Sequence, residues 1–161
     1  MKKIRRFIVL GFTIGIIFSC TDEPKNTSIK TEEIQFTKEG ELFLLKASDT
    51  LQKLDIEFAE TPYEQQTGLM YRQTMEAHQG MLFVYSREAI HSFYMKNTYI
   101  PLDLIFFGKD STVVSFQENA RPLDETSLPS KVPAQFILEV NAGKVEEWNL
   151  TEGDKMLITR D

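Results

Sequence analysis

The sequence lacks most of the residue patterns that mark an enzyme or a metal protein. Its 161 residues include one cysteine, Cys20, so no disulfide can form within the chain and the fold depends on a hydrophobic core. The two histidines, His78 and His91, lie thirteen positions apart in no ligand-spaced motif, and Asp124 with Glu125 does not make a calcium-binding loop. No G-x-S-x-G motif, S-x-x-K motif or glycine-rich phosphate loop is present. The sequence therefore predicts no metal and no cofactor, and it indicates no reaction.

No apolar run is long enough to cross a membrane. The run at residues 7–18 has twelve residues, whereas a transmembrane helix needs about 20. It follows the basic residues 2–6 and therefore has the length and flank of a signal peptide. It ends at Ser19-Cys20, which resembles the bacterial lipobox, in which the cysteine is diacylated and becomes the new N-terminus. We predict a signal peptide over residues 1–19 and a lipid on Cys20; the alternative is an uncleaved membrane-inserted segment in which Cys20 is an ordinary small residue.

Basic residues are in the minority, which limits the partners of the chain. The formal net charge is −6, and removal of a leader with four basic residues and no acid changes it to −10. An acidic surface repels phosphate backbones and anionic headgroups. We therefore expect no nucleic-acid partner, and membrane contact through the lipid alone.

The polar composition of residues 20–32 predicts a flexible tether between the lipid and a single domain at residues 33–161. The acidic pair Asp22 and Glu23 resembles the export tags of some surface lipoproteins, and the alternative is a solvated linker. The predicted location is the cell envelope, anchored to a membrane, with the outer membrane favoured and the domain either periplasmic or surface-exposed.

Short apolar segments separated by turn residues predict a mainly β domain. Leu54, Ile56 and Phe58 alternate with acidic residues, which is typical of a half-buried strand. Further strands are predicted at residues 41–45, 81–85, 92–95, 102–107, 112–116, 136–140 and 155–159. The expected architecture is one compact β-sandwich or open barrel with one or two short helices.

Two helices and one long loop complete this prediction. The sequence Thr61-Pro62-Tyr63-Glu64 is a capping box with proline at the first helical position, and it predicts a helix to about Met75. Tyr63, Thr67 and Met70 fall on one face of that helix. A second helix is predicted at residues 142–150, and prolines 122, 129 and 133 indicate an ordered loop.

Several ordered motifs resemble one family. They are GLMYR (68–72), GMLFVY (80–85), FYMKNT (93–98), IPLD (100–103), ARP (120–122), FILEVNAG (136–143) and GD (153–154). Together they are similar to the domain of unknown function 192 family over about residues 54–161, with Tyr94 where the family often has tryptophan. The resemblance implies a small, jelly-roll-like β domain and no established activity.

The polar segment between two predicted strands is the candidate binding site. Lys96, Asn97, Thr98 and Asp103 provide a cation, an amide, a hydroxyl and an anion within eight positions. In a binding cleft, Lys96 would hold an anionic or hydroxyl-rich group, Asn97 would orient it and Asp103 would accept hydrogen bonds. The alternative is a buried structural network at the turn. Arg72 either complements the end of the predicted helix or reaches into the same cleft.

These observations leave three functional hypotheses. The preferred one is a non-enzymatic ligand- or partner-binding module that uses the cleft. The second is a hydrolase of envelope polysaccharide or a related polymer, in which Asp103 and Glu139 form a carboxylate pair. The third is a purely structural envelope lipoprotein. Four methionines are expected to fill the core rather than bind copper: Met70, Met75, Met81 and Met95.

Overall fold

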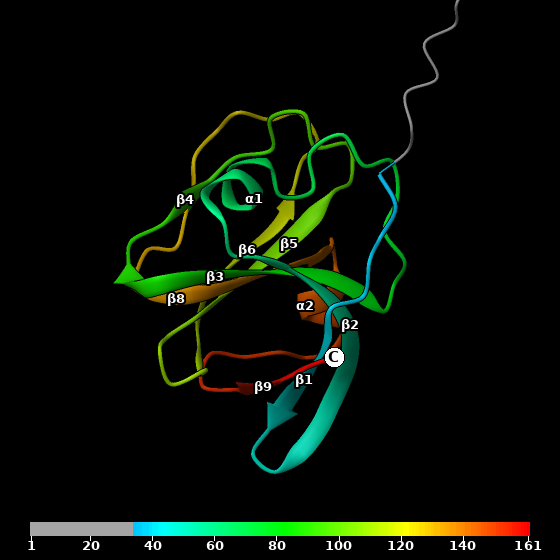
Figure 1. Cartoon of the computed structure of the whole chain (residues 1–161). Helices are drawn as coiled ribbons and strands as arrows, with labels where there is room; N and C mark the ends of the chain where they lie inside the picture. Colours follow the sequence, from blue (N-terminus) through cyan, green and yellow to red (C-terminus); the bar gives the residue numbers. More distant parts are fainter. Residues whose placement is uncertain (1–33) are drawn as a thin grey trace, which may run out of the picture. The chain divides into compact units, whose positions relative to one another are not determined.

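The computed structural model describes residues 34–161, so the predicted signal peptide, Cys20 and the whole of the predicted tether lie outside the described residues. Within that part, nine strands and two short helices follow one another along the chain (Figure 1). They are β1 (Gly40–Lys46), β2 (Asp49–Ala59), α1 (Pro62–Thr67), β3 (Gln79–Ala89), β4 (Ser92–Phe93), β5 (Leu102–Phe107), β6 (Val113–Ala120), β7 (Leu128–Pro129), β8 (Ala134–Asn141), α2 (Lys144–Glu147) and β9 (Lys155–Arg160).

Seven of these strands form one curled sheet in the order β6-β5-β8-β3-β2-β1-β9. Its pairs are antiparallel except β2 with β3, which are parallel because α1 lies in the connection between them. The two edges approach each other where Thr112 bridges Lys155 and the Val113 N–H donates to the Asp154 carbonyl at 2.7 Å. The sheet is therefore a half-barrel, which confirms the prediction of a mainly β domain of open-barrel type.

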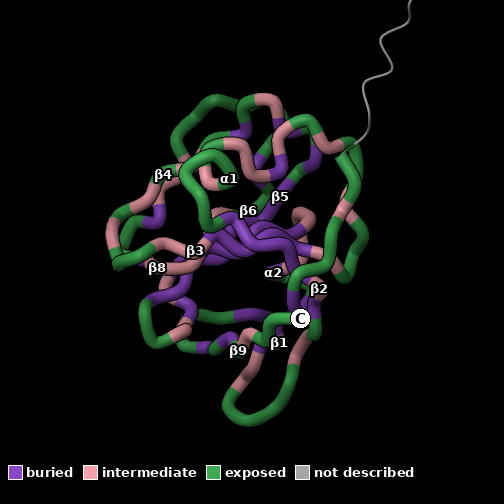
Figure 2. Tube along the Cα trace, viewed as in Figure 1, coloured by how far each residue is buried: buried purple, intermediate pink, exposed green. Residues whose placement is uncertain are grey.

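The middle of the sheet is buried, as the purple region at the centre of Figure 2 shows. All six residues of β5 are buried, which explains why its sequence, LDLIFF, is an apolar run rather than an alternation. One face packs against α2 through Ile105, Leu138 and Val145. The opposite face carries Leu104 and Ile137 with a second apolar cluster, on the side of α1 and β4.

The predicted helix from residue 62 to about Met75 is too long. Its capping box is present, because the Glu64 N–H donates to Thr61 Oγ1 at 3.2 Å and the Thr61 N–H donates to Glu64 Oε2 at 2.8 Å. The helix ends at Thr67, since Gly68 has φ +46°, and a Cβ there would come within 2.8 Å of the Phe83 ring. The predicted apolar face is also wrong, because α1 buries no residue and Tyr63 is exposed.

Two other predicted elements are shorter in the structure. The strand predicted at 92–95 is reduced to β4, which pairs with β7 inside the predicted proline-rich loop. The helix predicted at 142–150 is reduced to the four residues of α2. The remaining predicted strands lie within strands of the structure, except that Thr112, the first residue of the strand predicted at 112–116, precedes β6 and forms an isolated bridge.

Candidate functional site

A small pocket of about 110 Å³ lies beneath α1, between the end of that helix and the sheet. Its apolar walls come from Leu69, from Phe83 of β3 and from Phe93 of β4, and the rings of Phe83 and Phe93 meet edge to face at 5.0 Å. The backbone of Gly68 closes one side, where a side chain would collide with Phe83. The short α1 and its glycine end therefore define the pocket.

Glu139 of β8 provides the one carboxyl group among the residues that line this pocket. Glu139 lies opposite Met81 of β3 and Leu104 of β5, so its side chain shares the sheet face that looks toward α1. It is 6% exposed, and within the described residues its carboxyl makes no hydrogen bond or ion pair. Burial raises the pKa of Glu139 to about 8, because a charged carboxylate is poorly solvated there. At neutral pH Glu139 is therefore largely a neutral acid that can both donate and accept a hydrogen bond.

Tyr85 of β3 lies on the same face and also lines the pocket. Its ring stacks on His91, with 3.8 Å between centroids, and His91 Nε2 lies 3.1 Å from the Ala134 carbonyl. Burial, with a smaller contribution from Glu139, raises the pKa of Tyr85, and burial lowers the pKa of His91. Both rings are therefore neutral at neutral pH, and the phenol is held in place beside the carboxyl group.

Two larger hollows adjoin the pocket. One, of about 460 Å³, shares Thr67, Gly68 and Met70 with it, and the other, of about 310 Å³, shares Phe93 and Tyr94. We call these three neighbouring hollows the α1 groove; the Glu139 pocket shares lining residues with each of the other two. A ligand longer than the central pocket therefore has room on both sides.

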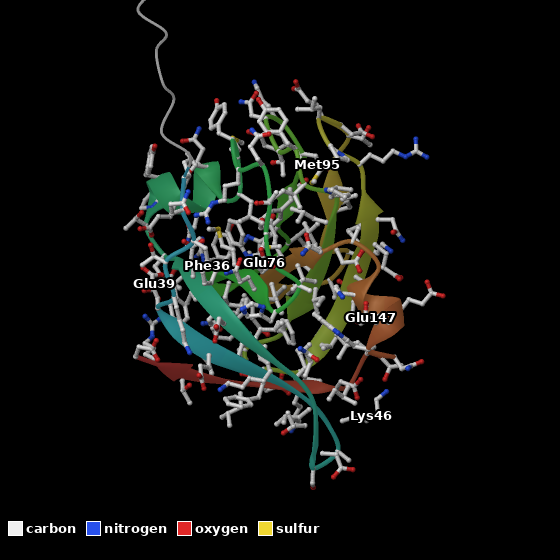
Figure 3. All side chains as sticks on the ribbon, turned by 90° about the vertical axis from the view of Figure 1, so that its right-hand side faces the viewer. Phe36, Glu39, Lys46, Glu76, Met95 and Glu147 are labelled. Atoms are coloured by element: carbon white, nitrogen blue, oxygen red, sulfur yellow. The ribbon has the colours of Figure 1, made fainter. Side chains whose placement is uncertain are left out.

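A buried ion pair lies in the larger hollow. Arg72 Nη1 is 2.5 Å from Glu57 Oε2, and both side chains are almost fully buried. The other oxygen of Glu57 accepts a hydrogen bond from the Thr37 N–H at 2.8 Å. Thr37 belongs to the segment that precedes β1. Figure 3 shows this segment, which contains the labelled Phe36 and Glu39, beside β2. The Glu57–Arg72 pair thus joins β2, the segment after α1 and the start of the domain.

The structure does not gather the four residues of the predicted cleft around one cavity. Arg72 lines one end of the α1 groove and the exposed Lys96 lines the other. Asn97 Nδ2 donates to the Tyr71 hydroxyl at 2.8 Å, and the backbone carbonyl of Asn97 accepts a hydrogen bond from the Tyr71 N–H. Asp103 is fully buried away from the groove.

Asp103 has structural partners for both carboxyl oxygens. Oδ1 accepts from the Asn119 N–H at 2.8 Å and Oδ2 accepts from the Val145 N–H at 3.0 Å. The register pairs Asp103 with Val140 and Leu104 with Glu139, so Asp103 and Glu139 point to opposite faces of the sheet. The two carboxyl groups cannot flank one glycosidic bond, and the paired-carboxylate hydrolase does not fit this geometry.

Two features are absent from residues 34–161. No three histidine, cysteine or acidic residues there lie close enough together to hold a metal ion. No helix in this part of the chain is long and apolar enough to cross a membrane. Met81 and Met95 are buried in the second apolar cluster, Met75 packs against it and Met70 lines the groove.

The fold and the pocket define the chain as a small half-barrel β domain with a groove on one face. Comparison with family models gives the particular family: the chain belongs to the DUF192 family, described as an uncharacterized ACR, whose model matches residues 43–158. The motif resemblance in the sequence is thereby confirmed. No curated protein matches the chain.

Two solved structures are similar to the chain over most of their length. A crystal structure of a candidate transcription regulator from Sinorhizobium meliloti 1021 has 36% sequence identity and a TM-score of 0.72, over 78% of this chain and 96% of that one. A protein of unknown function from Novosphingobium aromaticivorans DSM 12444 also has 36% identity, with a TM-score of 0.69 over 73% of this chain and 83% of that one. These relatives share the fold, and their descriptions give no activity for the α1 groove.

Proposed function

We propose that this chain is a non-enzymatic binding module of the cell envelope, held at a membrane by a lipid on Cys20, whose ligand enters the α1 groove and contacts Glu139. The observation that carries the binding site is the carboxyl of Glu139, which is buried, faces a pocket and has no hydrogen-bond partner within the described residues. A carboxyl group that is almost buried and lines a pocket is placed to bind a polar group that enters it. A ligand in the pocket would supply one.

The same geometry argues against catalysis in the pocket. General acid-base hydrolysis needs a second group, either a nucleophile or a base that activates water. Glu139 is the one carboxyl among the lining residues, and its phenolic neighbour Tyr85 has a raised pKa, so no ready base lies beside it. Binding is therefore the function that these groups support best.

The test is a screen of uncharged small molecules, including simple amides such as acetamide and N-methylacetamide, against the full chain in detergent micelles. We expect binders to shift the NMR signals of Tyr85, Phe93 and Glu139, and Glu139→Leu to abolish those shifts. Glu152→Leu is the matched control, because Glu152 is exposed. The binding site is wrong if no molecule shifts these signals, or if the shifts persist in Glu139→Leu. If Glu139→Leu does not fold, Glu139→Gln serves in its place. Its effect on binding is expected to be weaker, and it is measured as the change in affinity for each binder.

The structural-lipoprotein alternative gives a different result in the same experiment. A domain that only supports the envelope has no reason to keep an unpartnered carboxyl in a pocket, since an apolar residue there would stabilise the fold. That alternative predicts that no molecule shifts the signals of Tyr85, Phe93 and Glu139 in the wild-type protein.

A further inference from the structure

The size of the central pocket limits what can enter it. Sites for drug-sized ligands usually measure about 300–1,000 Å³, whereas the Glu139 pocket measures about 110 Å³. It therefore accepts one substituent rather than a whole ligand. The two adjoining hollows, of about 460 and 310 Å³, leave room for a chain that continues on both sides. The α1 groove thus fits an extended molecule with a small side group.

Exposed tyrosines follow the groove. Tyr63 and Tyr71 line the larger hollow and are 75% and 54% exposed, and Tyr94, shared by the other two hollows, is 41% exposed. Large aromatic side chains in such a row provide flat apolar faces with a polar hydroxyl at the edge. Sugar rings offer the complementary surface, with C–H groups on their faces and hydroxyls around their edges.

The free polar groups of the central pocket are uncharged. Gln66, Tyr85 and the neutral acid of Glu139 line it and make no side-chain hydrogen bond within the described residues, and no lysine, arginine or aspartate is among the lining residues. A carboxylic acid presents an O–H donor beside a carbonyl acceptor. The carbonyl of an acetamido group accepts a hydrogen bond from that O–H, and its N–H, on the opposite side of the trans amide, is left for the other polar groups of the pocket. A methyl group attached to that amide would pack against the apolar wall formed by Leu69 and Phe93.

We infer that the α1 groove binds an extended, uncharged glycan whose sugars carry N-acetyl groups, with one acetamido group inserted against Glu139. The inference rests on the proposed binding function and specifies its ligand. The sugar rings on either side stack on Tyr63 and Tyr94, and the carbonyl of the inserted acetamido group accepts a hydrogen bond from the carboxyl group.

The test compares two tetrasaccharides that differ in one substituent. Chitotetraose and cellotetraose share the β-1,4 linkage and glucose ring, but chitotetraose has an acetamido group where cellotetraose has a hydroxyl. We expect the full chain, by isothermal titration at pH 6, to bind chitotetraose at least about tenfold more tightly, because the acetamido group adds one hydrogen bond and one buried methyl group, each of which raises the affinity several-fold. De-N-acetylated chitotetraose, which carries amines, should bind no better than cellotetraose.

Variants separate the acetamido contact from ring stacking. Glu139→Leu should lower the affinity for chitotetraose about tenfold, to that for cellotetraose, whereas Glu139→Gln should keep it within about threefold since an amide also donates and accepts. Tyr63→Ala and Tyr94→Ala should weaken both tetrasaccharides. Tyr99→Ala is the matched control, because Tyr99 is 42% exposed but lines none of the three hollows.

The outcomes distinguish this inference from the proposed function. The glycan inference is overturned if chitotetraose binds no more tightly than cellotetraose, or if Glu139→Leu leaves its affinity unchanged. If simple amides bind in a Glu139-dependent way while both tetrasaccharides fail, the binding function stands and the glycan ligand does not. If neither the amides nor the tetrasaccharides bind, both proposals fail.

Discussion

Asp103 and Glu139 lie on neighbouring strands, one residue out of register, and their carboxyl groups point to opposite faces of the sheet. Asp103 accepts two backbone hydrogen bonds, from Asn119 and Val145, and so fixes the end of β6 and the start of α2. Glu139 accepts none within the described residues and faces a pocket. Two acidic residues in similar apolar runs thus have different physical roles, one in stability and one in binding.

The first prediction concerns the structural role of Asp103. Asp103→Ala leaves the Val145 N–H buried without an acceptor, at a cost of about 1–3 kcal/mol, and removes the part-buried hydrogen bond from the Asn119 N–H. We expect the free energy of unfolding, measured in urea, to fall by about 2–4 kcal/mol. Asp49→Ala is the matched control, because Asp49 is exposed at the β1–β2 turn, and it should change stability by less than about 0.5 kcal/mol. Equal stability of the two variants would contradict the role assigned to Asp103.

The sequence predicted correctly those structural features that depend on contacts between residues close together in the chain. The capping box at Thr61 and Glu64 fixes the start of α1 through hydrogen bonds between residues three positions apart, so it is visible in the sequence. The end of α1 depends on Gly68 packing against Phe83, which belongs to a strand that the sequence does not place beside it. The predicted helix was too long for this reason.

The same limit applies to the site. The apolar run FILEV around Glu139 indicated a buried strand, but the face that Glu139 occupies depends on the register of β8 with β3 and β5. A shift of one residue would exchange the two faces. The sequence therefore identified Glu139 and Asp103 as unusual carboxyl groups and could not show that they lie apart. Lys96 and Arg72 were predicted to share a cleft, and they line opposite ends of the α1 groove.

The second prediction concerns the buried pair of Glu57 and Arg72. Arg72→Met leaves the Glu57 carboxylate buried without its cation, and removal of one partner of such a pair costs about 3–5 kcal/mol. We expect that loss in urea unfolding, and faster amide exchange at Thr37, whose N–H donates to Glu57.

The double variant Glu57→Gln with Arg72→Met should recover much of this stability, because no charge then remains buried. The exposed pair of Lys53 and Glu41, 2.8 Å apart, provides the comparison, and Lys53→Met should cost less than about 1 kcal/mol. A double variant no more stable than Arg72→Met would contradict the argument from buried charge.

The third prediction tests the lipid anchor proposed for Cys20. Cys20 is the one cysteine in the chain, so Cys20→Ser removes the sole thiol that can be acylated. We expect the wild-type protein to incorporate labelled palmitate and to sediment with membranes, and the variant to do neither. Ser19→Ala keeps a small residue before the cysteine and should behave as wild type. Unchanged membrane fractionation of Cys20→Ser would rule out the anchor.

The fourth prediction concerns the pH dependence that Glu139 imposes on stability. In the unfolded chain Glu139 loses its proton near its ordinary pKa of 4.5, whereas in the folded chain burial holds the proton to about pH 8. Between these values the folded state binds more protons than the unfolded state, so the free energy of unfolding falls as pH rises, by about 1 kcal/mol per pH unit, and levels off above pH 8. Glu139→Gln removes this dependence and should be the more stable protein at neutral pH.

The measurement is the difference in unfolding free energy between wild type and Glu139→Gln from pH 4 to pH 9. The other ionisable groups near this face are Tyr85, His91 and the Glu57–Arg72 pair, and both proteins contain them, so their titrations cancel in the difference. Glu152→Gln, at an exposed site, should show no slope relative to wild type. A flat difference for Glu139→Gln would mean that Glu139 is ionised in the folded protein. The pocket would then hold a negative charge instead of a hydrogen-bond donor, and its ligand would have to be a cation rather than an acetamido group.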